Sequence, residues 1–409
     1  MQSSHISRSD PPALAATPPH GPTLDAPTTG EENGCASAER NSMNPRPDVS
    51  ATRGFSRSGL LIALYRSVPV FLLGVIPLIS VVMALTMYSH ADSIALDFHH
   101  ELYPETELVL HGHNPYPPVD ADLSDGSNNI WPIAAVIPVA PLVLLPPAVA
   151  DWTMTILVLA SLAGALWVIG VRDWRVYGIT LLWPPVVSAY QTANATLPLC
   201  LLCALAWRYR DRRWIPGLAI GAALAVKFFL WPLVLWLAAV KQWRSSLLSV
   251  AMAAASLLLL LPFTPIGAYF ALLRNLSNTF DDKSYTIFAL LLDAGAPSPF
   301  ARAVTLALGG ALLALCWRRR SFALAIGAAL VLSPIVWLHF FALLIVPLAI
   351  ARPRFSSAWL LALPLWLVPG SANGDPWQTA LGLVVLLTIL LVCVRREAPA
   401  SGRSHVVAR

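Results

Sequence analysis

The segment Asp97–Pro118 reads DFHHELYPETELVLHGHNPYPP and closely follows the predominantly apolar run Val68–Tyr88. Together with His90 it holds five of the nine histidines, besides one aspartate and three glutamates, although only 12% of all residues are charged. The apolar run has 21 residues, and about 20 are enough to cross the hydrocarbon core of a bilayer. A polar segment directly after such a run must face water at one membrane surface. This boundary therefore predicts a membrane protein with a water-facing site.

The composition supports an all-α polytopic membrane protein. Hydrophobic residues make up 56% of the chain, and the 12% charged fraction is about half that of a soluble domain. Only helices and closed barrels satisfy the backbone in lipid, and the continuous apolar runs exclude a barrel, whose strands alternate. The net charge of +5 comes from basic clusters beside apolar runs, so we expect no nucleic-acid partner.

The basic clusters predict the topology, because Lys and Arg concentrate in cytoplasmic loops. If every cluster is cytoplasmic, about twelve crossings follow, with both termini in the cytoplasm and 90–150 as an extracytoplasmic loop. We expect a disordered tail over residues 1–55, a transmembrane domain over 56–397 and a second tail over 398–409. The predicted crossings are 68–88, 151–171, 176–190, 194–208, 214–226, 228–240, 246–262, 301–317, 321–337, 339–350, 357–371 and 376–394.

Residues 130–150 are apolar but contain five prolines. If this segment crossed the membrane, Arg172 and Arg175 would lie outside and the later clusters would invert. A segment that dips in and returns keeps every cluster inside. We therefore expect a re-entrant or interfacial element, which a proline-broken backbone can form where protein covers it.

Asp97 is the first candidate for chemistry. It follows the first crossing by about nine residues, and a partly shielded carboxylate there can hold a raised pKa and act as a general base. A solvated loop acid is the alternative, and Asp92, Glu101 and Glu105 are the nearest competitors for the role of base. Lys227 is the second candidate, since it lies between two apolar runs, where a lysine usually faces a cavity or a partner. It could meet a phosphate, or extend its ammonium to the interface.

Other polar residues fall at the predicted outer surface. Gln191 and Asn194 lie at a hairpin turn and could bind a ligand or close the turn, and His339 lies at another outer turn. Asn114 and Tyr116, in the stiff sequence GHNPYPP, could hydrogen-bond a sugar or cap a surface helix.

The histidines of the first loop raise the possibility of a metal site. His99, His100, His111 and His113, with nearby glutamates, carry suitable ligand atoms, but their spacing matches no metalloenzyme motif. We expect neither a metal nor another cofactor.

Several motifs occur in an order that resembles glycosyltransferase family 87. They are Asp97-Phe98, GHNPYPP, Trp131-Pro132, Gln191-x-x-Asn194, Gly217 and Gly221 with Lys227 and Pro232, and LSPIVWLH over 332–339. Together they cover about residues 60–350. Trp131-Pro132 is followed by Ile133 where the family has a second proline. Pro104 interrupts the helix expected after Asp97, and Pro232 lies two residues farther from Lys227 than the family pattern has it. These departures from the family pattern bear on the identity of the substrate more than on the class of reaction.

The resemblance implies a GT-C fold and an inverting transfer of a sugar, typically mannose, from a polyprenyl-phosphate donor to a lipid or glycan acceptor outside the cytoplasmic membrane. Asp97 would be the base on the acceptor hydroxyl. The residues that would bind substrate are Lys227, His339, Asn114, Tyr116, Gln191, Asn194 and Trp131. A transporter or lipid-linked-sugar flippase is the main alternative, although no inverted repeat is visible; a non-catalytic assembly protein is another.

Overall fold

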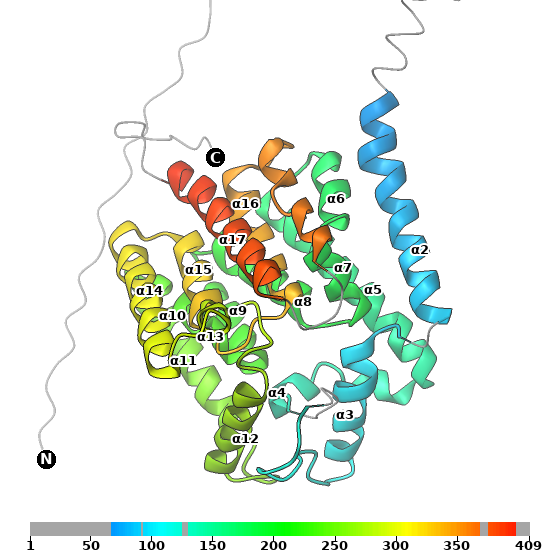
Figure 1. Cartoon of the computed structure of the whole chain (residues 1–409). Helices are drawn as coiled ribbons and strands as arrows, with labels where there is room; N and C mark the ends of the chain where they lie inside the picture. The colour runs from blue at the N-terminus through cyan, green and yellow to red at the C-terminus, as the bar shows by residue number, and fades with distance from the viewer. Residues whose placement is uncertain (1–66, 91–92, 125–129, 369–374, 398–409) are drawn as a thin grey trace, which may run out of the picture. The chain divides into compact units, whose positions relative to one another are not determined.

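The computed structural model describes residues 67–90, 93–124, 130–368 and 375–397. Every regular element in these ranges is a helix (Figure 1). The two predicted tails, 1–55 and 398–409, lie outside the described residues. The all-α prediction is confirmed for the part of the chain that is described.

The α-helices vary from four residues to 23. They are α2 (Ile76–His90), α3 (Tyr103–Leu110), α4 (Ile133–Val136), α5 (Pro147–Ile169), α6 (Trp174–Leu181), α7 (Pro184–Gln191), α8 (Thr196–Arg208), α9 (Ile215–Val226), α10 (Pro232–Ala239), α11 (Trp243–Leu258), α12 (Ile266–Thr279), α13 (Ile287–Asp293), α14 (Ser298–Arg319), α15 (Phe322–Leu332), α16 (Ile345–Ala351) and α17 (Pro376–Glu397). Two π-helical segments, η1 (Phe71–Val75) and η2 (Phe98–Leu102), and five 3₁₀ segments, η3 (Ala140–Leu144), η4 (Phe228–Leu230), η5 (Leu338–Leu344), η6 (Ser357–Leu360) and η7 (Leu363–Leu367), complete the set.

Four helices in the described ranges are long and apolar enough to cross a membrane: Ser67–His90, Pro147–Ile169, Ser298–Arg319 and Pro376–Glu397. A fifth crossing results if α7 and α8, bent by 116°, form one broken span. The membrane character is therefore clear, but the predicted twelve crossings are not confirmed. A helix rises 1.5 Å per residue, so the 12 residues of α9 reach only part of the way across a core of about 30 Å.

Prolines cause several of these breaks. Pro184 and Pro185 start α7 after Trp183, so the predicted crossing 176–190 is two short helices, α6 and α7. Proline fixes φ and lacks an N–H, so it is tolerated in a first turn and not in a helix interior. The proline-rich segment 130–150 likewise contains only α4 and η3 before α5 begins. Neither piece can cross a bilayer, and its re-entrant placement stays a prediction.

The main core joins α5, α7, α8, α9, α15, η5 and α16. Within it, α9 and α11 approach closely because α9 carries two glycines. A Cβ on Gly217 would lie 2.7 Å from the Ser245 carbonyl oxygen, and one on Gly221 would lie 2.5 Å from the Met252 sulfur. Ser249 strengthens this contact by donating to the Gly217 carbonyl at 3.0 Å.

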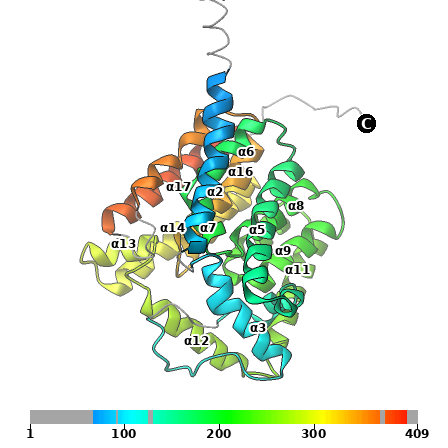
Figure 2. The ribbon, with the colours of Figure 1, turned by 90° about the vertical axis from the view of Figure 1, so that its right-hand side faces the viewer.

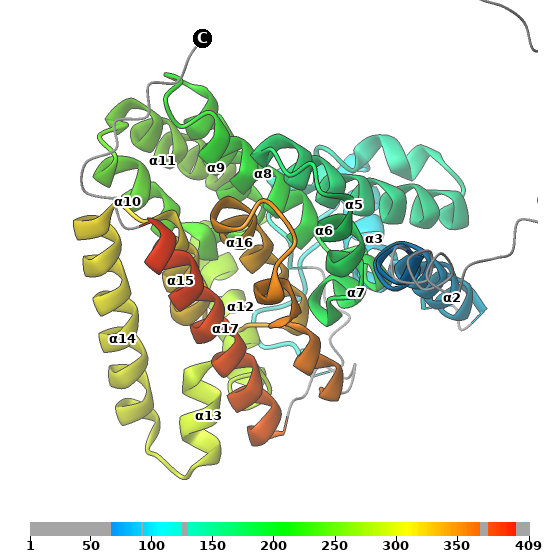
Figure 3. The ribbon, with the colours of Figure 1, turned by 90° about the horizontal axis from the view of Figure 1, so that it is seen from above.

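A second, smaller core holds the chain after α3 against α12. It contains Tyr116, Leu123, Ile130, Ile133, Leu260, Tyr269 and Leu272. Figures 1 and 2 show α3 and α12 together at the lower end of the described chain. Seen from above, α2 and α14 lie at opposite edges (Figure 3). The first loop is thus a packed layer at one end of the helices.

Candidate active site

Asp97 lies where the first loop meets the break between α7 and α8. The backbone N–H groups of Asp97 and Phe98 both donate to the Thr192 carbonyl, at 3.0 and 3.3 Å. The side chain of Asn194 donates through Nδ2 to Asp97 Oδ2 at 2.6 Å. Asn194 Oδ1 in turn accepts from the backbone N–H and the hydroxyl of Thr196, at 3.1 and 2.8 Å. These bonds orient the Asn194 amide with its N–H toward the carboxylate.

Two further carboxyl groups continue from Asp97 along the same helix. Glu101 and Glu105 follow at spacings of four and eight residues, and both interact electrostatically with Lys227, as Asp97 does. The helix keeps its path past Pro104 because η2 is a π turn, in which the Tyr103 N–H donates to the Phe98 carbonyl. Pro104 then occupies the first turn of α3. It interrupts regular α-helical bonding without ending the helix.

Trp131 joins the carboxyl groups to the rest of the site. Its indole N–H donates to Glu101 Oε2 at 2.7 Å and its backbone N–H to Glu105 Oε2 at 3.2 Å. The hydroxyl of Tyr116 donates to its carbonyl at 2.9 Å. Each such bond stabilises by about 1 kcal/mol. Together the three bonds fix both the backbone and the ring of Trp131.

Lys227 ends α9 in an extended conformation. Its ammonium nitrogen lies 3.6 Å from the centroid of the Trp131 ring and 5.9 Å from that of Phe340. Among the described residues, the ion pairs within 4.0 Å are His99–Asp151 and Arg175–Asp173. Lys227 therefore faces aromatic rings and is electrostatically close to three carboxyl groups without contacting them directly. A cation–π contact of this kind contributes about 0.5–2 kcal/mol.

An apolar cavity of about 190 Å³ lies beside this cluster. Trp131 forms part of its wall, together with Leu102, Val139, Met154, Leu199 and Val226. One tryptophan thus contacts a carboxyl group, an ammonium group and an apolar cavity. An amphiphilic ligand could place its charged group beside Lys227 and its apolar part in this cavity.

Burial changes the protonation of the carboxyl groups. It raises the pKa of Asp97, although the Asn194 hydrogen bond and the Lys227 charge favour the ionised form. Burial and the neighbouring Asp97 charge raise the pKa of Glu101 to about 8. Burial also raises the pKa of Glu105 well above its ordinary range. At neutral pH Glu101 is therefore mainly protonated, because burial disfavours its charged form.

A sequence profile of glycosyltransferase family 87 matches residues 129–347, more than half of the chain. The chain belongs to glycosyltransferase family 87. It is therefore a glycosyltransferase, which acts on a sugar donor and an acceptor. Searches of curated proteins and of solved structures find no significant match.

The family 87 profile covers Trp131, Asn194, Lys227 and His339, whereas Asp97 lies before the matched region. The structure brings Asp97 to that region through Asn194, which is 97 residues away in the sequence. His339 is buried, and its Nε2 has no hydrogen-bond partner among the described residues. Its ring lies 4.9 Å from that of Phe340. Phe340 is thus a common neighbour of His339 and Lys227.

Three of the expected binding residues of this glycosyltransferase occupy other settings. Asn114 is exposed, and its Oδ1 accepts the Tyr116 N–H at 3.1 Å, which closes a local turn. Tyr116 is buried and supports Trp131. Gln191 is the half-buried last residue of α7, and no hydrogen bond in the described chain joins its side chain to the cluster. Their roles in substrate binding stay predictions.

The sequence suggested Glu101 and Glu105 only as competitors of Asp97 for the role of base, and the structure brings both to Trp131. Their spacing from Asp97 places them on successive turns of one helix face, a signal that the sequence contains. Asp92, the other competitor, lies outside the described residues. Two of the first-loop histidines have other partners: His99 Nδ1 lies 2.8 Å from Asp151 Oδ2, and His111 Nδ1 lies 2.7 Å from the Glu107 carbonyl. Within the described residues, no group of three His, Cys, Asp or Glu side chains is arranged to hold a metal.

Proposed function

We propose that this glycosyltransferase moves a sugar, with mannose the first to test, from a polyprenyl-phosphate donor to a lipid or glycan acceptor, with inversion at the anomeric carbon. The observation that carries the proposal is the meeting of Asp97, Lys227 and an apolar cavity around Trp131. Such a donor has an apolar chain, an anionic phosphate and a reactive sugar carbon. The site offers a matching environment for each.

In the proposed reaction, the acceptor hydroxyl oxygen attacks the anomeric carbon while Asp97 takes its proton. The bond from the anomeric carbon to the phosphate oxygen breaks, and the polyprenyl phosphate leaves with the electron pair. A general base contributes about 10²–10⁴-fold to such a step. The charge that develops on the phosphate needs a cation in a site of low dielectric, and Lys227 provides it.

Asp97 is a better base than the two glutamates. Glu101 has a pKa of about 8 and accepts the indole N–H of Trp131. Glu105 is completely buried and holds the backbone of Trp131. Asp97 is half-buried, and both Asn194 and Lys227 favour its ionised form. A raised pKa also makes an ionised carboxylate a stronger base.

We further propose that the enzyme is a multi-pass protein of the cell membrane, with both termini in the cytoplasm and the site on the outer face. The one-sided basic clusters support this orientation. The layer formed by α3, α4 and α12 would then face outward, and the loops carrying Arg172 and Arg213 would face the cytoplasm.

Proteoliposomes loaded with a radiolabelled polyprenyl-phosphate sugar test the function, assayed with and without acceptor. We expect acceptor-dependent transfer by the wild type and a loss of about 10²–10⁴-fold in Asp97→Asn, which keeps the shape but cannot take a proton. Movement of the donor across the bilayer without transfer would identify a flippase instead. Equal transfer rates for Asp97→Asn and the wild type would reject Asp97 as the base.

A further inference from the structure

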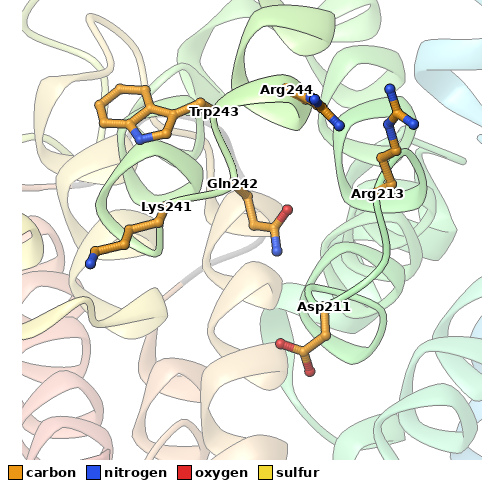
Figure 4. A pocket seen from close by; sticks show the side chains of 6 residues that line it. All are labelled: Asp211, Arg213, Lys241, Gln242, Trp243 and Arg244. Atoms are coloured by element: carbon orange, nitrogen blue, oxygen red, sulfur yellow. The ribbon is translucent and has the colours of Figure 1, made fainter.

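A second pocket, lined mainly by charged and polar side chains, lies away from the candidate active site. It has a volume of about 430 Å³ and is formed by the loop after α8 and the turn between α10 and α11 (Figure 4). The side chains that line it are Asp211, Arg213, Lys241, Gln242, Trp243 and Arg244. Lys227 precedes and Lys241 follows the η4–α10 segment. The two sites therefore lie at opposite ends of this helical segment.

The charge of this pocket is largely uncompensated. Three cationic side chains line it with a single carboxylate, Asp211. Neither ion pair found in the described chain involves any of them. The guanidinium of Arg213 instead lies 4.5 Å from the centroid of the Trp214 ring. A concave surface with excess positive charge attracts anions.

The same pocket offers hydrogen-bond donors. Helix α11 has 16 residues and begins beside it, with Gln242 as a cap residue that makes no side-chain capping bond. The first N–H groups of a helix have no partner within the helix and favour a phosphate oxygen. In Figure 4 the Gln242 amide lies between Lys241 and Trp243 on one side and Arg213 and Asp211 on the other. Guanidinium groups match the oxygens of a phosphate especially well.

Exposed tryptophans indicate where the phosphate comes from. Trp214 and Trp243 are 47% and 55% exposed, and Trp317, whose ring lies 6.2 Å from that of Trp243, is 48% exposed. Tryptophan is enriched at the headgroup level of membranes, and basic clusters there attract anionic lipids. We propose that this pocket binds the phosphate group of an anionic lipid headgroup. The proposal is independent of the transfer reaction.

Lipid titration of the purified full-length protein, followed by native mass spectrometry, tests this binding. The probes are phosphatidylglycerol, the zwitterionic phosphatidylcholine and inorganic phosphate. We expect a preference for phosphatidylglycerol that weakens about fivefold in Arg244→Gln and about 30-fold in Arg213→Gln/Arg244→Gln. Phosphatidylcholine binding should not change. Both arginines are exposed, so thermal unfolding should match that of the wild type.

Arg395→Gln/Arg396→Gln is the matched control. These arginines are also exposed and lie in the last turn of a helix, α17, and the double variant removes the same charge outside the pocket. Its phosphatidylglycerol affinity should stay within about twofold of the wild type, as expected for general surface attraction. An equal loss in the control and pocket variants would overturn the proposal. Binding of inorganic phosphate with displacement of phosphatidylglycerol would overturn the lipid as the source of the phosphate.

Discussion

The variant Asn194→Ala tests how the hydrogen bond from Asn194 affects the pKa of Asp97. Asn194 Nδ2 donates to Asp97 Oδ2 at 2.6 Å, and a hydrogen bond to a charged group contributes about 1.5–3 kcal/mol. One pKa unit corresponds to about 1.36 kcal/mol, so losing this bond should raise the pKa of Asp97 further by about 1–2 units. The direction is upward because the bond stabilises the ionised form.

The assay is the pH dependence of kcat in the proteoliposome system. If ionised Asp97 is the base, the wild-type rate increases with pH up to a plateau. In Asn194→Ala the rising limb should move to higher pH by about 1–2 units, with activity below the midpoint lower by about 10–100-fold. The plateau at high pH should largely recover.

Thr196→Val is the matched control for this experiment. It removes the hydroxyl that donates to Asn194 Oδ1 at 2.8 Å, but the backbone N–H of residue 196 still donates to the same oxygen. The bond from Asn194 to Asp97 remains, so the pH profile should not move. A profile that is unchanged in Asn194→Ala, or equally displaced in Thr196→Val, would refute the reasoning.

Three further predictions concern other parts of the chain. Lys227→Ala should raise the KM for the donor about 10-fold or more, because the phosphate loses its cation, with the acceptor KM little changed; an unchanged donor KM would contradict this role. Glu105→Ala should lower the free energy of unfolding by about 1–3 kcal/mol, because the Trp131 N–H loses its acceptor. Glu105→Gln should be as stable as the wild type, because its amide oxygen still accepts the Trp131 N–H. The wild type should lose stability as the pH rises through the raised pKa of Glu105, whereas Glu105→Gln should not, as measured by thermal unfolding against pH. Ser124→Cys should react with an impermeant thiol reagent in intact cells and Arg212→Cys only after permeabilisation, since the described native cysteines are buried; labelling of Arg212→Cys in intact cells would contradict the topology.

The spacing of residues along the sequence predicts only part of the candidate site. Asp97, Glu101 and Glu105 share a helix face through spacing alone, and this could be read from the sequence. The bond between Asp97 and Asn194 could not, because it joins residues that are far apart in the chain and depends on the 116° bend between α7 and α8. Tyr116 shows the same limit. Its motif suggested sugar binding, which stays a prediction, but its packing against Tyr269 and its bond to the Trp131 carbonyl, which support the site, could not be read from the sequence.

The sequence by itself determined the membrane character and the helical class, and it singled out Asp97 and Lys227 as candidates for chemistry. Long apolar runs and rare charges are properties of the composition and of the order of residues along the chain. The preference of such runs for a membrane does not depend on which tertiary contacts they make. Only the tertiary structure decided which apolar runs form continuous helices and that Trp131 joins carboxyl groups, ammonium and cavity. Those outcomes depend on proline breaks, close helix contacts and hydrogen bonds between distant segments, whose energies exist only once the segments have packed together.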